Sequence, residues 1–145
     1  MRRLAGLSAA LALAAAPALA ADATTYSFDG AFDDATFGVE SAIIDRGLVI
    51  DYVSHTGEML ARTGADVGSD VVLYDNADIF LFCSASLSRK MLEVDPMNIA
   101  YCPYSVFVFE REGGVTVGYR NMPEGPMQEV QALLDSIVRE AAGLD

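Results

Sequence analysis

The spacing of the apolar residues predicts three amphipathic helices. Between Ala35 and Ile43 apolar side chains recur at positions i, i+4, i+7 and i+8, which is one face of a helix. Asp33-Asp34 supplies an N-cap for this helix, and Gly47 is suited to its C-terminal end. The residues expected to face inward are Ala35, Val39, Ala42 and Ile43 in the first helix; Leu87, Met91 and Val94 in the second; and Met127, Val130, Leu134, Ile137 and Ala141 in the third.

The ends of the second and third helices are marked by capping residues and prolines. Ser84 and Ser86 are candidate N-caps of the second helix, which ends at Asp95-Pro96. The third helix begins near Pro126. A shorter helix is predicted from Glu58 to Thr63.

Five segments have the pattern of β-strands. Ile79–Cys83 is apolar without alternation, which predicts a strand buried on both faces. A long strand is expected over 99–110, interrupted at Pro103, and Gly113-Gly114 then turns the chain into the alternating strand 115–119. The remaining two strands are expected at 26–32 and 48–53, whereas 67–76 fits either an irregular loop or a brief strand at 71–74.

The order β-α-β-(α)-β-α-β-β-α predicts an α+β fold, with helices packed on one face of a largely antiparallel sheet. The strand that ends at Cys83 and the strand that begins near Cys102 are expected in one sheet. Helices 87–94 and 127–141 are expected to pack on that sheet, and Phe82 and Val106 to lie in the core.

Residues 1–20 have the pattern of a cleaved secretory signal peptide. Arg2 and Arg3 precede an apolar stretch, Pro17 interrupts it, and Ala18-Leu19-Ala20 is a small-x-small cleavage site. We therefore expect a single domain over 21–145, exported across the inner membrane to the periplasm. After cleavage, no further apolar run is long enough to span a bilayer.

The charge of the chain excludes several partners. Loss of Arg2 and Arg3 lowers the Lys and Arg count from 9 to 7 against 21 Asp and Glu, so the net charge changes from −12 to −14. Such a chain binds neither nucleic acid nor anionic lipid by charge. The expected partner is a small ligand or a protein.

One block of the sequence is similar to a known family. The block contains Phe82-Cys83-Ser84-Ala85, Ser88-Arg89-Lys90-Met91, Asp95-Pro96, Asn98-Ile99 and Cys102-Pro103-Tyr104. It resembles a branch of domain-of-unknown-function family 302, and the similarity extends over about 25–122. Members often have an aspartate directly before a histidine, whereas two residues separate Asp51 from His55 here. The resemblance implies a compact α+β domain, often a homodimer, with no established activity.

Cys83 and Cys102 are the first candidates for chemistry. If their strands are antiparallel, a disulfide could close a loop of about 18 residues and stabilise the fold by about 3 kcal/mol. The alternatives are two buried free thiols and a redox or metal site. A helix N-terminus lowers the pKa of a thiol such as Cys83, whereas burial raises it. No CxxC motif is present.

His55, the only histidine, is the second candidate, with Met59 four residues later. His55, Met59 and Cys83 would suit a soft metal, and His55 with Met59 would suit axial ligation of haem. The alternative is a structural histidine that bonds Asp51 or the local backbone. We expect the turn that carries His55 to lie near Cys83.

These features favour a non-enzymatic, exported accessory or ligand-binding domain, because no catalytic motif is present and the sequence identifies no cofactor. The ligand is expected near Cys83, Cys102 and His55. The alternative is a thiol-redox, soft-metal or haem-binding protein that uses the same residues.

Overall fold

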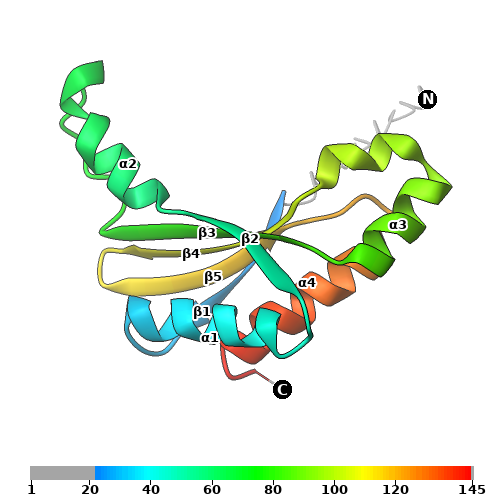
Figure 1. Ribbon diagram of the computed structural model, residues 1–145. Coiled ribbons are helices and arrows are strands. Elements are labelled where there is room, and N and C mark those ends of the chain that lie inside the picture. The colour runs from blue at the N-terminus through cyan, green and yellow to red at the C-terminus, as the bar shows by residue number, and fades with distance from the viewer. Residues whose placement is uncertain (1–21, 145) are drawn as a thin grey trace, which may run out of the picture.

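The computed structural model describes residues 22–144, in which five antiparallel strands form one sheet in the order β1-β5-β4-β3-β2 (Figure 1). The strands are β1 (Ala23–Phe28), β2 (Val49–Ser54), β3 (Asn76–Cys83), β4 (Tyr104–Arg111) and β5 (Gly114–Arg120). The helices are α1 (Phe32–Ile44), α2 (Thr56–Thr63), α3 (Ala85–Val94) and α4 (Gln128–Ala141), with 3-10 segments η1 (Ala65–Val67) and η2 (Pro96–Tyr101). The predicted α+β fold is confirmed.

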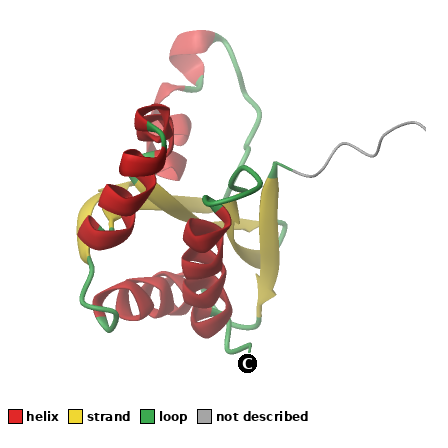
Figure 2. Ribbon diagram, turned by 90° about the vertical axis from the view of Figure 1, so that its right-hand side faces the viewer, coloured by secondary structure: helices red, strands yellow, loops and turns green. Residues whose placement is uncertain are grey.

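The core lies between one face of the sheet and the helices α1 and α4 (Figures 1 and 2). Every residue that the sequence placed on the inner faces of the first and third helices is buried. Phe82 and Val106 are fully buried, as predicted, and the alternating residues Val115, Val117 and Tyr119 of β5 also face this core. Burial of this continuous apolar layer is the main stabilising term of the fold.

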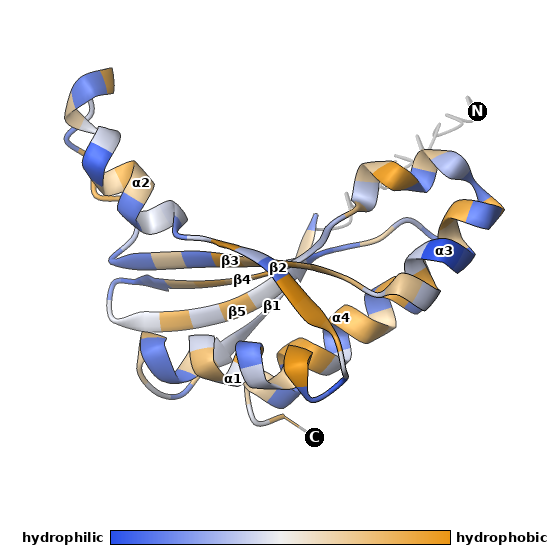
Figure 3. Ribbon diagram, in the orientation of Figure 1, coloured by the Kyte–Doolittle hydropathy of each residue, from blue (hydrophilic) through white to orange (hydrophobic). Residues whose placement is uncertain are grey.

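The other face of the sheet, which we call the open face, is not covered by α1 or α4. Phe80 and Phe82 point into the core, whereas Leu81 and Cys83 are half-buried on the open face. The prediction that this strand is buried on both faces is therefore wrong. In Figure 3 the part of β3 that leads toward α3 is coloured as hydrophobic. Such an unbroken apolar run also suits a strand whose second face is only partly covered.

The remaining helices project from opposite ends of the sheet. α2 follows β2 and precedes β3, and α3 with η2 connects β3 to β4 at the other end (Figure 1). The expectation that helix 87–94 packs on the sheet is wrong, because α3 packs mainly on η2. Its Met91 is buried, but Val94 is 58% exposed rather than inward-facing.

Two segments differ from their predicted strands. Residues 96–101 form η2, because the Asp95 side chain accepts a hydrogen bond from the Met97 backbone N–H at 2.9 Å and begins a 3-10 turn. Pro103 follows a cis peptide bond, and β4 begins only at Tyr104. β1 spans Ala23–Phe28 instead of the predicted 26–32, whereas residues 68–75 form no strand, in agreement with the loop alternative.

The predicted signal peptide lies outside the described residues. Within residues 22–144, no helix has the length and apolar character needed to cross a bilayer.

Candidate functional site

Antiparallel pairing brings the two cysteine-bearing strand ends together. Phe82 pairs with Tyr104, so Cys83 at the end of β3 lies beside the residues that lead into β4. This confirms that the two strands share one sheet. Cys102 is the last residue before the cis Pro103 and closes η2.

Ser88, on α3, connects the two cysteines. The Cys102 thiol lies 4.0 Å from the Ser88 hydroxyl, and the same hydroxyl donates a hydrogen bond to the Tyr104 phenol oxygen at 3.1 Å. The Cys83 sulfur also interacts with the Ser88 side chain. Ser84 caps α3 by accepting from the Leu87 N–H, which fixes the helix turn that carries Ser88. We call Cys83, Ser88, Cys102 and Tyr104 the cysteine corner.

Both cysteines are free thiols, so the predicted disulfide is not formed. Burial raises the pKa of the Cys83 thiol, and negative charge on Cys102 raises it further. The Tyr104 backbone and Ser88 oppose this effect by hydrogen bonding to the sulfur. Burial therefore outweighs the lowering expected at a helix N-terminus, and Cys83 is held as a neutral thiol.

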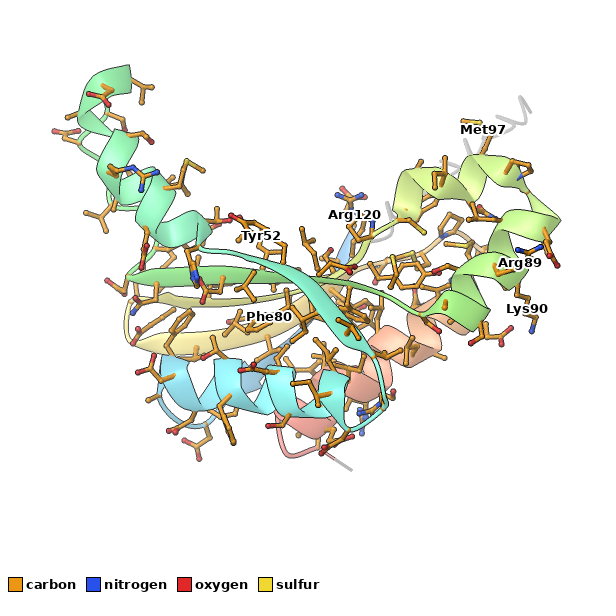
Figure 4. The ribbon with its side chains drawn as sticks, viewed as in Figure 1. Tyr52, Phe80, Arg89, Lys90, Met97 and Arg120 are labelled. Carbon is orange, nitrogen blue, oxygen red and sulfur yellow. The ribbon has the colours of Figure 1, made fainter. Side chains whose placement is uncertain are left out.

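A pocket of about 230 Å³ adjoins the cysteine corner on the open face. Leu81 pairs with Ser105 on the neighbouring strand, and Tyr101 and Pro103 flank Cys102 in the chain. Arg120 brings a positive charge to this otherwise mainly apolar pocket, and its side chain projects from the open face (Figure 4). The lining residues are Leu81, Ala100, Tyr101, Pro103, Ser105, Arg120 and Met122.

His55 lies far from the cysteine corner, so the expectation that it lies near Cys83 is wrong. In the antiparallel β2–β3 pair, Val49 is opposite Cys83 and Ser54 is opposite Ile79. Four residues of β3, or about 13 Å, therefore separate the position beside His55 from Cys83. One metal ion cannot bind both side chains. Antiparallel pairing places the end of β2 beside the start of β3, not beside its end.

His55 instead forms a local ion pair. Its Nδ1 lies 2.8 Å from an Asp78 carboxylate oxygen, not from Asp51 as suggested by the sequence. This hydrogen bond and the charge of Asp78 raise the pKa of His55. Met59 lies on the first turns of α2, 41% exposed. Axial haem ligands approach from opposite sides of the ring, which two side chains on one helical turn do not provide.

Residues 22–144 contain no group of three or more His, Cys, Asp or Glu side chains arranged to hold a metal ion. The predicted set of His55, Cys83 and Met59 therefore does not converge, and Cys83 and Cys102 are the soft donors that the fold brings together.

A second polar cluster joins the edge strand β1 to α4. The Asp135 carboxylate accepts hydrogen bonds from the hydroxyls of Tyr26 at 2.6 Å and Tyr119 at 2.9 Å. The Arg139 guanidinium lies over the Tyr26 ring, 5.8 Å from its centre. Burial is the main cause that raises the pKa of Tyr119 to about 12. Since both tyrosines donate to one carboxylate, this cluster holds β1, β5 and α4 together.

Sequence reasoning missed Ser88, Arg120 and Asp135. The cap at Ser84 could have located Ser88, because a residue four positions later lies on the same helix face. Arg120 and Asp135 carried no such signal, because their neighbours depend on the pairing of β5 and on the packing of α4.

The chain belongs to the family described as domain of unknown function DUF302, whose sequence model matches residues 23–141. It is similar in structure to an uncharacterized conserved DUF302 protein from Bacillus stearothermophilus, known from a crystal structure. The TM-score is 0.62 and the identity 15%, over 86% of this chain and 95% of that one. At this identity the likeness shows the fold alone. No curated protein matches the chain in sequence.

Proposed function

We propose that this protein is a non-enzymatic, exported binding domain whose ligand is held at the cysteine corner. The observation that supports the proposal is that the pairing of β3 with β4 brings Cys83 and Cys102 together at one end of the sheet, where the Cys102 thiol lies 4.0 Å from the Ser88 hydroxyl. An adjoining pocket leaves room for a ligand to enter from the open face. Export is supported by the leader pattern of residues 1–20.

The ligand that suits these donors is a single Cu(I) ion. Soft thiolate ligands select Cu(I), which needs few ligands. Cys83 and Cys102 supply two such donors without His55 or Met59. The two largest causes that raise the pKa of Cys83 are burial and the charge of Cys102. A bound cation offsets both causes, because it stabilises the two neighbouring thiolates.

A competition titration of the reduced mature protein with Cu(I) tests this proposal, with a chromogenic Cu(I) chelator as competitor. We expect one tightly bound Cu(I) in the wild type and at least a tenfold loss of affinity in Cys83→Ser and Cys102→Ser, or about 1.4 kcal/mol. His55→Ala and Met59→Leu are the matched controls and keep wild-type affinity. Equal affinity in the two serine variants and the wild type would contradict the proposal.

The second candidate function is reversible disulfide formation between Cys83 and Cys102, favoured by their shared contact with Ser88. An external disulfide would accept two electrons and two protons and leave as two thiols, while one S–S bond forms in this chain. The raised pKa of Cys83 slows this exchange, since the thiolate is the attacking species. Thiol counting on protein isolated from the periplasm separates the two functions: two free thiols favour metal binding, and none favours the redox function.

A further inference from the structure

We propose that the pocket beside Arg120 binds a small organic monocarboxylate whose apolar body has about the size of a benzene ring. The lining residues of this pocket come from β3, η2, β4, β5 and the segments that follow η2 and β5. None of them belongs to the cysteine corner. The inference therefore goes beyond the proposed function, and it requires neither Cu(I) nor the two thiols.

The floor of the pocket is a row of three side chains on neighbouring strands of the open face. Leu81 pairs with Ser105 in the β3–β4 ladder. In the β4–β5 ladder Val106 is opposite Tyr119, so the next pair along these antiparallel strands is Ser105 with Arg120. Neighbouring strands lie about 4.8 Å apart, and the row therefore spans about 10 Å. One end of the floor is apolar and the other is cationic, with a hydroxyl between them.

The polar groups of the pocket have no partner within the protein. None of the ion pairs within residues 22–144 includes Arg120, and its side chain forms no hydrogen bond there. The hydroxyls of Tyr101 and Ser105 likewise have no hydrogen-bond partner in the described part of the chain. A guanidinium binds a carboxylate through two parallel, charge-assisted hydrogen bonds, and the neighbouring hydroxyl of Ser105 can donate a third. These unpaired donors favour a carboxylate as the ligand.

The backbone that carries Arg120 is fixed before any ligand binds. The Asn121 N–H donates to the Asp22 carbonyl oxygen at 3.0 Å, and the Met122 N–H donates to the Gln131 side-chain oxygen at 2.8 Å. The segment is thus held by the chain that leads into β1 on one side and by α4 on the other. Met122 is also buried, and it gives the pocket a firm apolar wall. A ligand therefore need not order this segment, which lowers the cost of binding.

The charges around the pocket orient the ligand. Asp51 lies in the bulge of β2 beside Leu81, three strand spacings or about 14 Å from Arg120. Asp22, just before β1, and Glu124, four residues after Arg120, are both exposed, and neither forms an ion pair with Arg120. The positive charge of Arg120 is therefore available to a ligand. A carboxylate is favoured at the Arg120 end of the row, and its apolar body lies toward Leu81.

The volume of the pocket sets the size of the ligand. The pocket measures about 230 Å³, whereas an apolar cavity of about 150 Å³ is large enough to accept benzene. The difference leaves room for one carboxylate group. Benzoate is therefore a suitable probe, and benzamide has nearly the same shape without the charge.

An NMR titration of the reduced, copper-free mature protein tests the proposal, with benzoate and benzamide as the two probes. We expect benzoate to cause saturable shifts at the backbone amides of Ser105, Arg120 and Met122, with a dissociation constant of about 1 mM or below. Benzamide should bind at least tenfold more weakly. Arg120→Gln should weaken the binding of benzoate at least tenfold, because the charge-assisted hydrogen bonds are lost.

Two control variants should keep the wild-type affinity for benzoate. Arg111→Gln is the matched control, because Arg111 is also an exposed arginine on the open face but lies at the other end of β4, in an ion pair with Glu112 at 3.2 Å. Cys83→Ser removes a proposed copper ligand and leaves the carboxylate pocket intact. A failure of Cu(I) binding and a failure of this inference are therefore measured separately.

Three results would overturn the proposal. The first is the absence of saturable shifts at the residues that line the pocket. The second is an equal affinity for benzoate in the wild type and Arg120→Gln, or an equal loss in Arg111→Gln and Arg120→Gln. The third is an equal affinity for benzamide and benzoate, which would show that the pocket does not select a negative charge.

Discussion

Replacement of Asp135 by alanine tests how the edge strand β1 is held in the fold. The carboxylate accepts hydrogen bonds from two tyrosine hydroxyls, at 2.6 Å from Tyr26 and 2.9 Å from Tyr119. Tyr119 is 2% exposed, so water cannot easily replace the lost carboxylate, and the Thr24 side chain is the hydrogen-bond partner that its hydroxyl keeps, whereas Tyr26 is only partly buried. The bond from Tyr119 therefore accounts for most of the expected loss of stability.

A hydrogen bond to a charged group contributes about 1.5–3 kcal/mol, and a buried donor without a partner costs about 1–3 kcal/mol. Since the Tyr26 hydroxyl can bond water in the variant and the Tyr119 hydroxyl keeps Thr24, we expect Asp135→Ala to lower the free energy of unfolding by about 1.5–3 kcal/mol. Asp135→Asn keeps one acceptor oxygen without the charge, and should cost about 1 kcal/mol.

Urea unfolding of the mature protein, followed by circular dichroism, measures both changes. The exposed Glu124→Ala is the control, with an expected change within about 0.5 kcal/mol. A double-mutant cycle with Tyr119→Phe should give a coupling energy of about 1–2 kcal/mol. A loss in Asp135→Ala below about 0.5 kcal/mol, or a coupling energy near zero, would refute the role given to this cluster.

Three further predictions concern protonation and the core. We expect NMR titration to give His55 a pKa above its ordinary value because of Asp78, and Asp78→Asn to lower it. The His55–Asp78 pair stabilises the fold at low pH, and this contribution is lost as the pH rises through the raised pKa of His55. A pKa of His55 that Asp78→Asn leaves unchanged would disprove this cause. Burial is the main cause that raises the pKa of Tyr119 to about 12, so the unfolded state loses the tyrosine proton first and the free energy of unfolding falls from about pH 10 to 12. Urea unfolding at alkaline pH should show a smaller decline in Tyr119→Phe than in the wild type. An identical decline would contradict the raised pKa of Tyr119. Val106→Asp places a charge in the core and unfolds the domain, whereas Val94→Asp leaves it folded because Val94 is 58% exposed. A cooperative thermal unfolding transition in Val106→Asp would contradict the burial of Val106.

The helix faces could be predicted from the sequence because their periodicity is local. Ala35, Val39 and Leu134 follow the 3.6-residue repeat, and each is fully buried. Val94 follows the same repeat but is exposed, because α3 has no sheet beneath its last turn. Periodicity therefore identifies the apolar face of a helix but not the element that covers it.

The position of His55 could not be predicted because it depends on the pairing of β2 with β3. The chain passes from β2 through α2 and η1 and returns antiparallel, so His55 meets Asp78 near the start of β3 and not Cys83 at its end. By contrast, the chain between Cys83 and Cys102 leaves and re-enters the sheet at the same end. The meeting of the two cysteine-bearing ends was predictable once antiparallel pairing was assumed, although the free state of the thiols was not.

The atoms that bind Cu(I) at the cysteine corner distinguish the proposed site from one that uses His55. X-ray absorption spectroscopy at the copper edge, on reduced protein loaded with one equivalent of Cu(I), reports the ligand atoms directly. We predict two sulfur ligands from Cys83 and Cys102, no imidazole nitrogen, and the same spectrum in His55→Ala. A spectrum with an imidazole nitrogen that disappears in His55→Ala, or one without two sulfur ligands, would contradict the claim.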